Sequence, residues 1–153
     1  MNYVGIDTGL GGGIAIIKKD EVIVTKMPVF EKDYDINSIV SLLLDNMPIA
    51  KVGIEKIHAN PKMARSACFN FGKGLGVLEG LVAALRIPYE LIPPKTWQKK
   101  MHNGVTGDNT KIKSIKAVNR LYPTLSLKAT DRSTKDHDGI ADAVMIANYI
   151  KNN

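Results

Sequence analysis

The start of the chain constrains the fold most, because three apolar, β-branched segments follow one another within residues 1–27. They cover residues 3–7, 12–18 and 21–27, and glycine-rich or charged stretches separate them. β-Branched and apolar residues favour strands, whereas glycine and charged residues favour turns. The opening therefore predicts a meander of three strands.

The rest of the sequence alternates between helix and strand patterns. Residues 36–44 carry apolar side chains at helical spacing behind Asp35, a suitable N-cap, and residues 51–57 return to a strand pattern. The further elements that we expect, in chain order, are a long helix over 64–85, a strand over 88–93, a short helix around Trp97, a helix over 110–121, a loop over 122–135 and a last helix over 138–151. A meander followed by this alternation predicts an α/β protein with a mixed sheet.

Length and hydropathy limit the class of protein. With 153 residues, 44% of them hydrophobic, the chain has room for one compact core, so we expect a single domain over residues 1–153. No stretch approaches the roughly 18 consecutive apolar residues of a membrane span, and Met1 leads straight into a strand pattern, so we expect a cytoplasmic protein. The single cysteine, Cys68, lies among apolar residues, which favours a buried side chain over a nucleophile.

The charge distribution favours a polyanionic partner. The formal net charge is +6, and lysine and arginine concentrate over residues 56–73 and 95–116. Clustered positive charge is typical of surfaces that bind nucleic acid, although many basic proteins bind none. The charge therefore makes nucleic acid the first partner to consider.

Two acidic residues lie in segments that are otherwise apolar. Asp7 ends the first predicted strand after Ile6, and Glu55 follows Ile54 in the strand predicted over 51–57. A buried charge costs several kcal/mol unless it is paired or bound to a metal, so both carboxylates need an explanation. The alternatives are a turn aspartate at a strand end and a glutamate on the solvent-facing side of a strand.

The last predicted helix supplies two more carboxylates. Asp138 and Asp142 are four residues apart and therefore lie on one helical face. Like charges at this spacing repel, and a divalent cation would reverse that cost. Interaction with the helix macrodipole explains Asp138 well but Asp142 poorly, since Asp142 lies in the most apolar part of the helix. Asp136 is the alternative to Asp138, although it is less able to share an ion with Asp142.

Together these acids predict a metal-dependent nuclease. The candidate catalytic and metal-binding residues are Asp7, Glu55, Asp138 and Asp142. Oxygen ligands suit Mg²⁺ or Mn²⁺, and the sequence has neither the His/Cys spacing of a zinc site nor a nucleophile paired with a base. Two such ions about 4 Å apart would support in-line hydrolysis of a phosphodiester by water, without a covalent intermediate.

The chain also resembles a known family, the RuvC-type Holliday-junction resolvases (crossover junction endodeoxyribonucleases), and in particular their short bacteriophage-encoded versions. The similar segments are GIDTG at 5–9, IEKIHANPKMARSACFNFGKGLGVLEG at 54–80, PPKTW at 93–97 with the following GDNTKIKSIKAV, and HDGIADAVMIA at 137–147. The resemblance implies a ribonuclease H-like fold: a mixed five-stranded sheet with helices on both faces. It also implies a magnesium-dependent enzyme of DNA recombination and repair that cuts branched DNA, which for a phage protein would act in the bacterial cytoplasm.

The resemblance assigns roles to the four acids. Asp7, Glu55 and Asp142 fall on the catalytic carboxylates of the family. Asp138 is displaced by one position, because the partner acid of the family lies three residues before the last one, where this chain has Gly139. A spacing of four still leaves the acid on the same helical face, so we retain Asp138.

DNA contacts follow from the same resemblance. His58 takes the place of an aromatic residue that stacks on a base near the crossover, and Lys111 is similar in position to a lysine near the scissile phosphate. Lys113 and Lys116 are either general phosphate contacts or part of a solvated basic helix face. The full set of candidate DNA-binding residues is His58, Lys62, Arg65, Lys111, Lys113 and Lys116.

A glycine-rich helix points to a second copy of the chain. The helix predicted over 64–85 contains Gly72, Gly74, Gly76 and Gly80, which lower its intrinsic helicity. Close approach of another backbone would compensate, and plain packing on the sheet is the alternative. Because symmetric cutting of a four-way junction needs two opposed active sites, we expect a homodimer through this helix.

Three other functions agree with parts of the sequence. The same metal site would serve a ribonuclease H that cuts RNA–DNA hybrids, and only the substrate groove discriminates the two. DTGLGGG at 7–13 also resembles the phosphate loop of actin-like or sugar-kinase ATPases, but that fold needs two such motifs in two lobes and this chain has one. An inactive nucleic-acid-binding relative would have lost carboxylates that are all present here.

Overall fold

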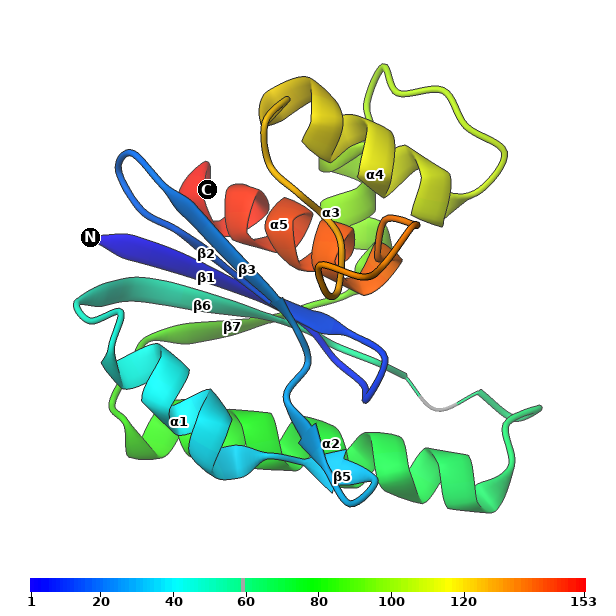
Figure 1. Ribbon diagram of the computed structural model, residues 1–153. Helices are drawn as coiled ribbons and strands as arrows, with labels where there is room; N and C mark the ends of the chain where they lie inside the picture. The colour runs from blue at the N-terminus through cyan, green and yellow to red at the C-terminus, as the bar shows by residue number, and fades with distance from the viewer. Residues whose placement is uncertain (59) are drawn as a thin grey trace.

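The computed structural model describes residues 1–58 and 60–153, and its centre is a five-stranded mixed sheet (Figure 1). The strands are β1 (Asn2–Asp7), β2 (Gly13–Ile17), β3 (Val22–Lys26), β6 (Ile49–Glu55) and β7 (Tyr89–Ile92). Their order is β3-β2-β1-β6-β7, in which β1, β2 and β3 pair antiparallel while β6 runs parallel to both β1 and β7. The predicted opening meander is confirmed, and β1 is the central strand.

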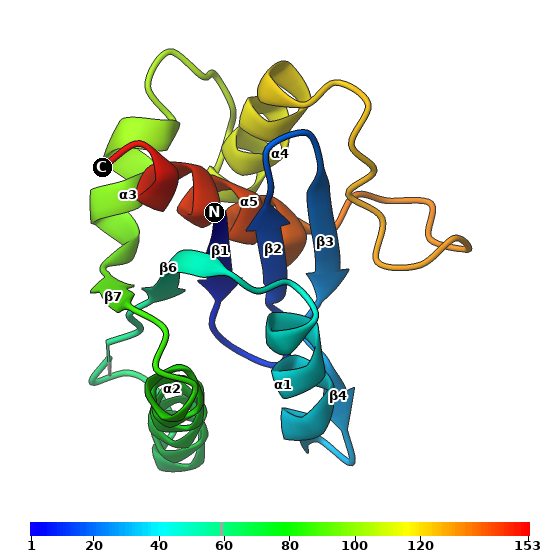
Figure 2. The same ribbon diagram turned by 90° about the vertical axis from the view of Figure 1, so that its left-hand side faces the viewer.

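Helices cover both faces of this sheet, as Figures 1 and 2 show. One face carries α1 (Ile36–Leu44) and the long α2 (Arg65–Ala84), and the other carries α3 (Pro94–Met101), α4 (Thr110–Leu121) and α5 (Asp138–Lys151). The expected helices are all present, and α4 and α5 have the predicted bounds. The predicted N-cap of α1 is confirmed, because Asp35 Oδ1 accepts a hydrogen bond from the Ser38 backbone N at 3.1 Å.

A small hairpin that the sequence pattern did not predict precedes α1. It consists of β4 (Val29–Phe30) and β5 (Asp33–Tyr34), and its two turn residues, Glu31 and Lys32, have φ angles of 47° and 66°. Two positive φ angles are the mark of a tight type I′ turn, which usually carries asparagine or glycine. With strands of two residues and without the usual turn residues, the hairpin has no pattern to detect.

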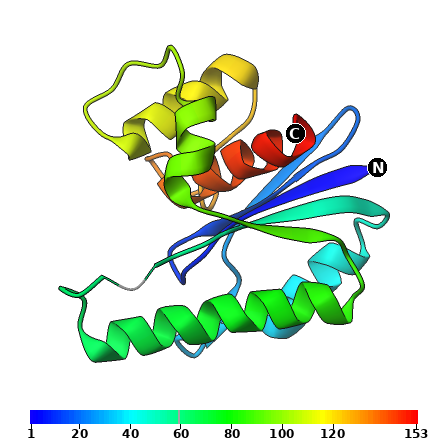
Figure 3. The same cartoon turned by 180° about the vertical axis from the view of Figure 1, so that it is seen from behind.

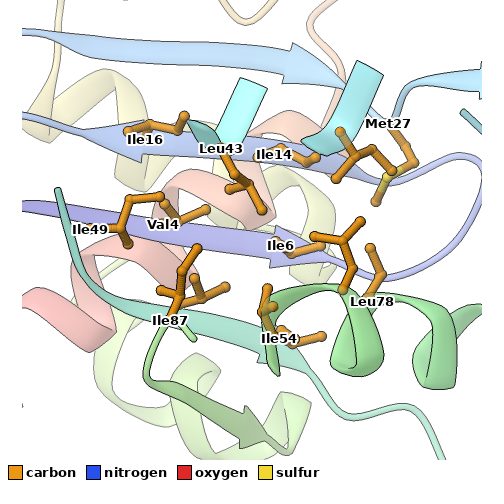
Figure 4. Packing of buried hydrophobic residues seen from close by; sticks show 14 of the residues in the cluster. Val4, Ile6, Ile14, Ile16, Met27, Leu43, Ile49, Ile54, Leu78 and Ile87 are labelled. Atoms are coloured by element: carbon orange, nitrogen blue, oxygen red, sulfur yellow. The ribbon is translucent and has the colours of Figure 1, made fainter. Parts of the chain in front are cut away.

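Alternation along β1 divides the buried side chains between two cores. Val4 and Ile6 point towards α1 and α2, where they pack with Leu43, Leu78 and other aliphatic side chains (Figure 4). On the opposite face β1 presents Gly5 to α5, and a β-carbon built on Gly5 would lie 2.1 Å from the Ala143 carbonyl oxygen. The absent side chain therefore lets α5 lie directly on the central strand.

The start of α2 is more exposed than the sequence suggested. The expectation that Cys68 is buried was wrong, because its side chain is partly exposed and its neighbour Phe69 is 71% exposed. The N-terminal half of α2, which carries both residues, extends beyond the sheet, as the view from behind shows (Figure 3), so it has less to pack against.

Among the described residues, no helix combines the length and the apolar character needed to cross a membrane.

Candidate functional site

The carboxyl ends of two neighbouring parallel strands bring two acids together. Asp7 is the last residue of β1 and Glu55 is the last residue of β6, and the register pairs Ile6 with Ile54 immediately before them. The Thr8 hydroxyl donates a hydrogen bond to the Glu55 carbonyl oxygen at 2.8 Å, which ties the two strand ends together. Parallel strands thus deliver the two carboxylates to the same edge of the sheet.

The first turn of α5 adds the second pair of acids at this edge. It packs tightly on the turn between β1 and β2, because a β-carbon on Gly139 would lie 2.7 Å from the Gly11 carbonyl oxygen. Asp138 opens the helix and Asp142 follows one turn later. A side chain at position 139 would collide with the backbone of the turn, whereas the side chain of Asp138 is partly exposed and reaches Lys111.

Burial and mutual repulsion perturb the pKa values of two of these acids. Burial, together with the negative charges of Glu55 and Asp142, raises the pKa of Asp7 to about 9. Burial also raises the pKa of Asp142 to about 7, with contributions from the charges of Glu55 and Asp138. The other acids are therefore close enough to Asp7 and Asp142 to disfavour the ionisation of these two carboxyl groups.

Protein donors partly satisfy these acids. The Trp97 indole N–H donates to Glu55 Oε1 at 2.9 Å. The fully buried Ser114 hydroxyl favours the charged form of Asp142 and so opposes the rise in its pKa. Lys111 Nζ lies 2.7 Å from Asp138 Oδ2. Burial works against the charge of Asp138, but the hydrogen bond and charge of Lys111 outweigh it and lower the pKa of that carboxyl.

Trp97 and Ser114 were not among the predicted site residues. Ser114 also lies 2.8 Å from the Nε2 atom of His102, whose ring stands edge-on to Trp97 with 5.3 Å between the ring centroids. A lone tryptophan after two prolines and a serine on the apolar side of a helix were the available signals. Neither indicates a role until α3 and α4 are placed over the strand ends.

The arrangement suits a divalent cation. Asp142 Oδ1 is buried and has no hydrogen-bond partner among the described residues, so this oxygen is available as a ligand. Two acids with raised pKa values gain most from a nearby positive charge. Within residues 1–58 and 60–153 no three His, Cys, Asp or Glu side chains are already arranged as a metal centre. The donors Trp97 and Lys111 instead hold two of the acids in the positions described.

The other predicted residues lie around this edge or farther along the helices. His58, Lys62 and Arg65 are exposed in and next to the segment that joins β6 to α2. Lys113 and Lys116 lie on α4, one partly buried and one exposed, three residues apart and therefore on neighbouring positions of its surface.

Asp136 lies apart from the cluster that contains Asp138. It is exposed and forms an isolated antiparallel bridge with Lys128. The charges that raise the pKa of Asp7, in contrast, include that of Asp138. The geometry therefore supports Asp138 over Asp136 as the partner of the other three acids.

No protein-family model and no curated protein sequence matches the chain. Solved structures do match it. RuvC of T. thermophilus in complex with Holliday junction substrate has a TM-score of 0.65 and 15% sequence identity, over 96% of this chain and 90% of that chain. A second Thermus thermophilus RuvC structure has a TM-score of 0.57 and 20% identity, over 96% and 91% of the two chains. The yeast mitochondrial Holliday junction resolvase Ydc2 has a TM-score of 0.52 and 15% identity, over 94% and 75%. At these identities the likeness establishes the fold, and it confirms the predicted ribonuclease H-like mixed sheet.

Proposed function

We propose that the chain is a structure-selective DNA endonuclease that resolves Holliday junctions and other branched DNA by metal-dependent phosphodiester hydrolysis. The observation that carries this proposal is the meeting of Asp7, Glu55, Asp138 and Asp142 at one edge of a sheet whose fold is shared with two junction resolvases. The net charge of +6 suits a DNA substrate.

In this proposal the four acids hold two Mg²⁺ ions, which Mn²⁺ can replace. The ions would supply an activated water and stabilisation of the leaving oxygen. Trp97 keeps the Glu55 carboxylate oriented through its hydrogen bond. The Ser114 hydroxyl favours the charged form of Asp142, which is the form that binds a cation. Lys111 forms an ion pair with Asp138 in the metal-free protein. In this proposal it contacts a phosphate of the bound strand.

The direct test compares three substrates at equal concentration: a synthetic four-way junction, a linear duplex of the same sequence and an RNA–DNA hybrid. We expect cleavage of the junction only, and only with Mg²⁺ or Mn²⁺ present. Preferential cleavage of the hybrid would identify a ribonuclease H instead. ATP hydrolysis without nuclease activity would favour the ATPase alternative.

Two aspartate-to-asparagine variants can identify the fourth metal ligand. Asp138→Asn should raise the magnesium concentration needed for half-maximal cleavage by about tenfold or more, because it removes a metal ligand. Asp136→Asn is the matched control, since its exposed carboxylate takes no part in the cluster. Magnesium titrations of junction cleavage measure both. If Asp136→Asn needed far more metal and Asp138→Asn behaved as wild type, the assignment would move to Asp136.

The raised pKa values predict how pH and metal affect stability. The pKa values of Asp7 and Asp142, about 9 and about 7, exceed the ordinary aspartate value, so the folded protein retains protons that the unfolded chain has released. The free energy of unfolding of the metal-free protein should therefore fall as the pH rises from about 5 to 9. Magnesium should raise the melting temperature more at pH 8 than at pH 5, because at pH 5 it must displace protons. An equal magnesium effect at both pH values would contradict this.

We also propose a homodimer that uses the outer face of α2. Gly72, Gly76 and Gly80 follow one another at intervals of four residues, and a β-carbon on any of them would meet no atom within 4 Å. Gly74, in contrast, packs against Tyr34 of the β4–β5 hairpin, so this contact accounts for that glycine but not for the other three. An open stripe of this kind allows close approach of a second helix.

Sedimentation at micromolar concentration tests the dimer. The wild type should be a dimer, and Gly76→Leu should be a monomer of at least equal thermal stability, since leucine favours the helix by roughly 0.5–1 kcal/mol over glycine. Ser41→Leu, which adds the same side chain to an exposed position of α1, should leave the dimer intact. A wild-type monomer with full junction activity would refute the proposal.

A further inference from the structure

A buried serine connects the acid cluster to a histidine at the end of α3. Ser114 has no exposed surface and lies on α4, which packs on α5 (Figure 1). A buried hydroxyl destabilises the fold unless it is hydrogen-bonded, so this serine needs polar partners. It has two of them. The hydroxyl favours the charged form of Asp142, and its Oγ atom lies 2.8 Å from the Nε2 atom of His102. His102 therefore lies one side chain behind an acid of the cluster.

The position of His102 is fixed by its backbone and by a neighbouring ring. Its backbone N donates to the Gln98 carbonyl oxygen at 2.9 Å, and its own carbonyl oxygen accepts from Val105 N at 3.0 Å. The Trp97 ring stands edge-on to the imidazole, with 5.3 Å between the centroids. The other surroundings of His102 are open, because the residue lines a cleft of about 420 Å³ between α3 and α4. The imidazole thus stands between the solvent and the buried Ser114.

The number of available hydrogens decides the direction of the two contacts of Ser114. A hydroxyl has one hydrogen, and an ionised carboxylate only accepts. The serine hydrogen must therefore point at Asp142 for the hydroxyl to favour the charged form of this acid. Its oxygen can then only accept from His102, which requires a hydrogen on Nε2. Burial, and next the charge of Lys113, lowers the pKa of His102, so at pH 8 the ring is neutral and carries a single N–H.

We propose that His102 is a positioning residue of the metal site, whose Nε2–H donates to Ser114 Oγ and thereby keeps the serine hydrogen directed at Asp142. The inference rests on the proposed nuclease function and adds a residue to the support of its metal site. In the other tautomer, Nε2 would accept the serine hydrogen, and a lone pair of the hydroxyl oxygen would face the carboxylate and repel it. The choice of tautomer thus decides whether Asp142 is held in the form that binds a cation.

Helix α3 and its C-cap would then support two acids by separate routes. Trp97 donates directly to Glu55 at the end of β6. His102, the C-cap of α3, acts on Asp142 of α5 through Ser114. One short helix therefore reaches both the strand half and the helix half of the acid cluster. Loss of such outer partners of metal ligands typically lowers metal affinity by roughly 10- to 100-fold.

The first test measures the affinity of the full chain for Mg²⁺ without DNA, by calorimetry at pH 8. Ser114→Ala and His102→Leu should each weaken Mg²⁺ binding about tenfold or more. His102→Gln should retain most of the affinity, because its amide can donate in place of the Nε2–H. Since His102 acts through Ser114, adding His102→Leu to Ser114→Ala should cause little further loss.

Tyr122→Phe is the matched control for these variants. It also removes a hydroxyl that links the end of α4 to α5, since the Tyr122 hydroxyl donates to Asn148 Oδ1 at 3.0 Å. That contact involves none of the four acids, so this variant should bind Mg²⁺ as the wild type does. An equal loss of Mg²⁺ affinity in Tyr122→Phe and Ser114→Ala would mean that both variants merely loosen the packing of α4 on α5, and the positioning role would be wrong.

The second test observes the tautomer directly, by nitrogen-15 NMR of the imidazole rings at pH 8. The chain has three histidines, and the signals that disappear in His102→Gln identify those of His102. We expect the hydrogen on Nε2 in the wild type and a mixture of both tautomers in Ser114→Ala, which lacks the acceptor. A hydrogen on Nδ1 in the wild type would overturn the proposal.

Failure of this inference can be told apart from failure of the proposed function. If the wild type cleaves junctions and binds Mg²⁺, but Ser114→Ala and His102→Leu bind the ion equally well, the positioning role is wrong and the nuclease proposal stands. If the wild type binds no Mg²⁺ and cleaves no junction, the proposed function itself fails, and the role of His102 fails with it.

Discussion

Replacing Asp7 with asparagine should reduce junction cleavage about a thousandfold or more while leaving junction binding intact. The Asp7 carboxylate lies at the centre of the acid cluster, where burial and the charges of Glu55 and Asp142 raise its pKa to about 9. An ionised carboxylate in this environment lowers the stability of the metal-free protein, as expected of a group whose role is to bind cations. Loss of one ligand removes several kcal/mol of transition-state stabilisation, whereas DNA affinity depends on the basic surface.

Single-turnover cleavage and a gel shift in Ca²⁺ measure the two effects separately. Asp20→Asn, an exposed position in the turn between β2 and β3, is the matched control and should change neither. Because asparagine cannot ionise, Asp7→Asn should also lose less stability than the wild type as the pH rises from about 5 to 9. Lost binding with normal cleavage would show that Asp7 is a DNA contact and not a metal ligand.

The regular elements could be predicted from the sequence because their patterns are strong and local. Apolar periodicity gave the bounds of α4 and α5, and the β-branched segments gave the meander. The β4–β5 hairpin lacked any such pattern, since its turn consists of Glu31 and Lys32 in a left-handed conformation that neither residue favours. The exposure of Cys68 depends on how far α2 extends past the sheet, which local sequence does not encode.

The acids of the site could be predicted, whereas the residues that support them could not. A carboxylate in an apolar segment is conspicuous in any sequence, and this signal identified Asp7, Glu55 and Asp142. Trp97, however, reaches Glu55 across 42 positions of sequence, and Ser114 reaches Asp142 only because α4 packs on α5. Such contacts are set by tertiary packing, so no spacing rule reveals them.

Gly5→Ala should destabilise the protein by about 3 kcal/mol or more, near the upper end of the cost of overpacking a core. A β-carbon at this position would lie 2.1 Å from the Ala143 carbonyl oxygen and 2.4 Å from the Ala147 backbone N. Both are backbone atoms of α5, so no change of side-chain rotamer can relieve the contact. Helix α5 must instead move away from β1, and this movement loosens the packing between the helix and the sheet.

Urea unfolding of wild type, Gly5→Ala and Gly11→Ala measures this cost. Gly11 is the matched control, because a β-carbon there meets nothing within 4 Å, and its substitution should change the free energy of unfolding by no more than about 0.5 kcal/mol. Equal stability of Gly5→Ala and wild type would mean that α5 does not lie on β1 as described. At temperatures where Gly5→Ala remains folded, junction cleavage should still fall more than binding, since α5 carries Asp138 and Asp142 while β1 carries Asp7. The close contact at Gly5 therefore fixes the distance between the two halves of the acid cluster as well as the packing of the core.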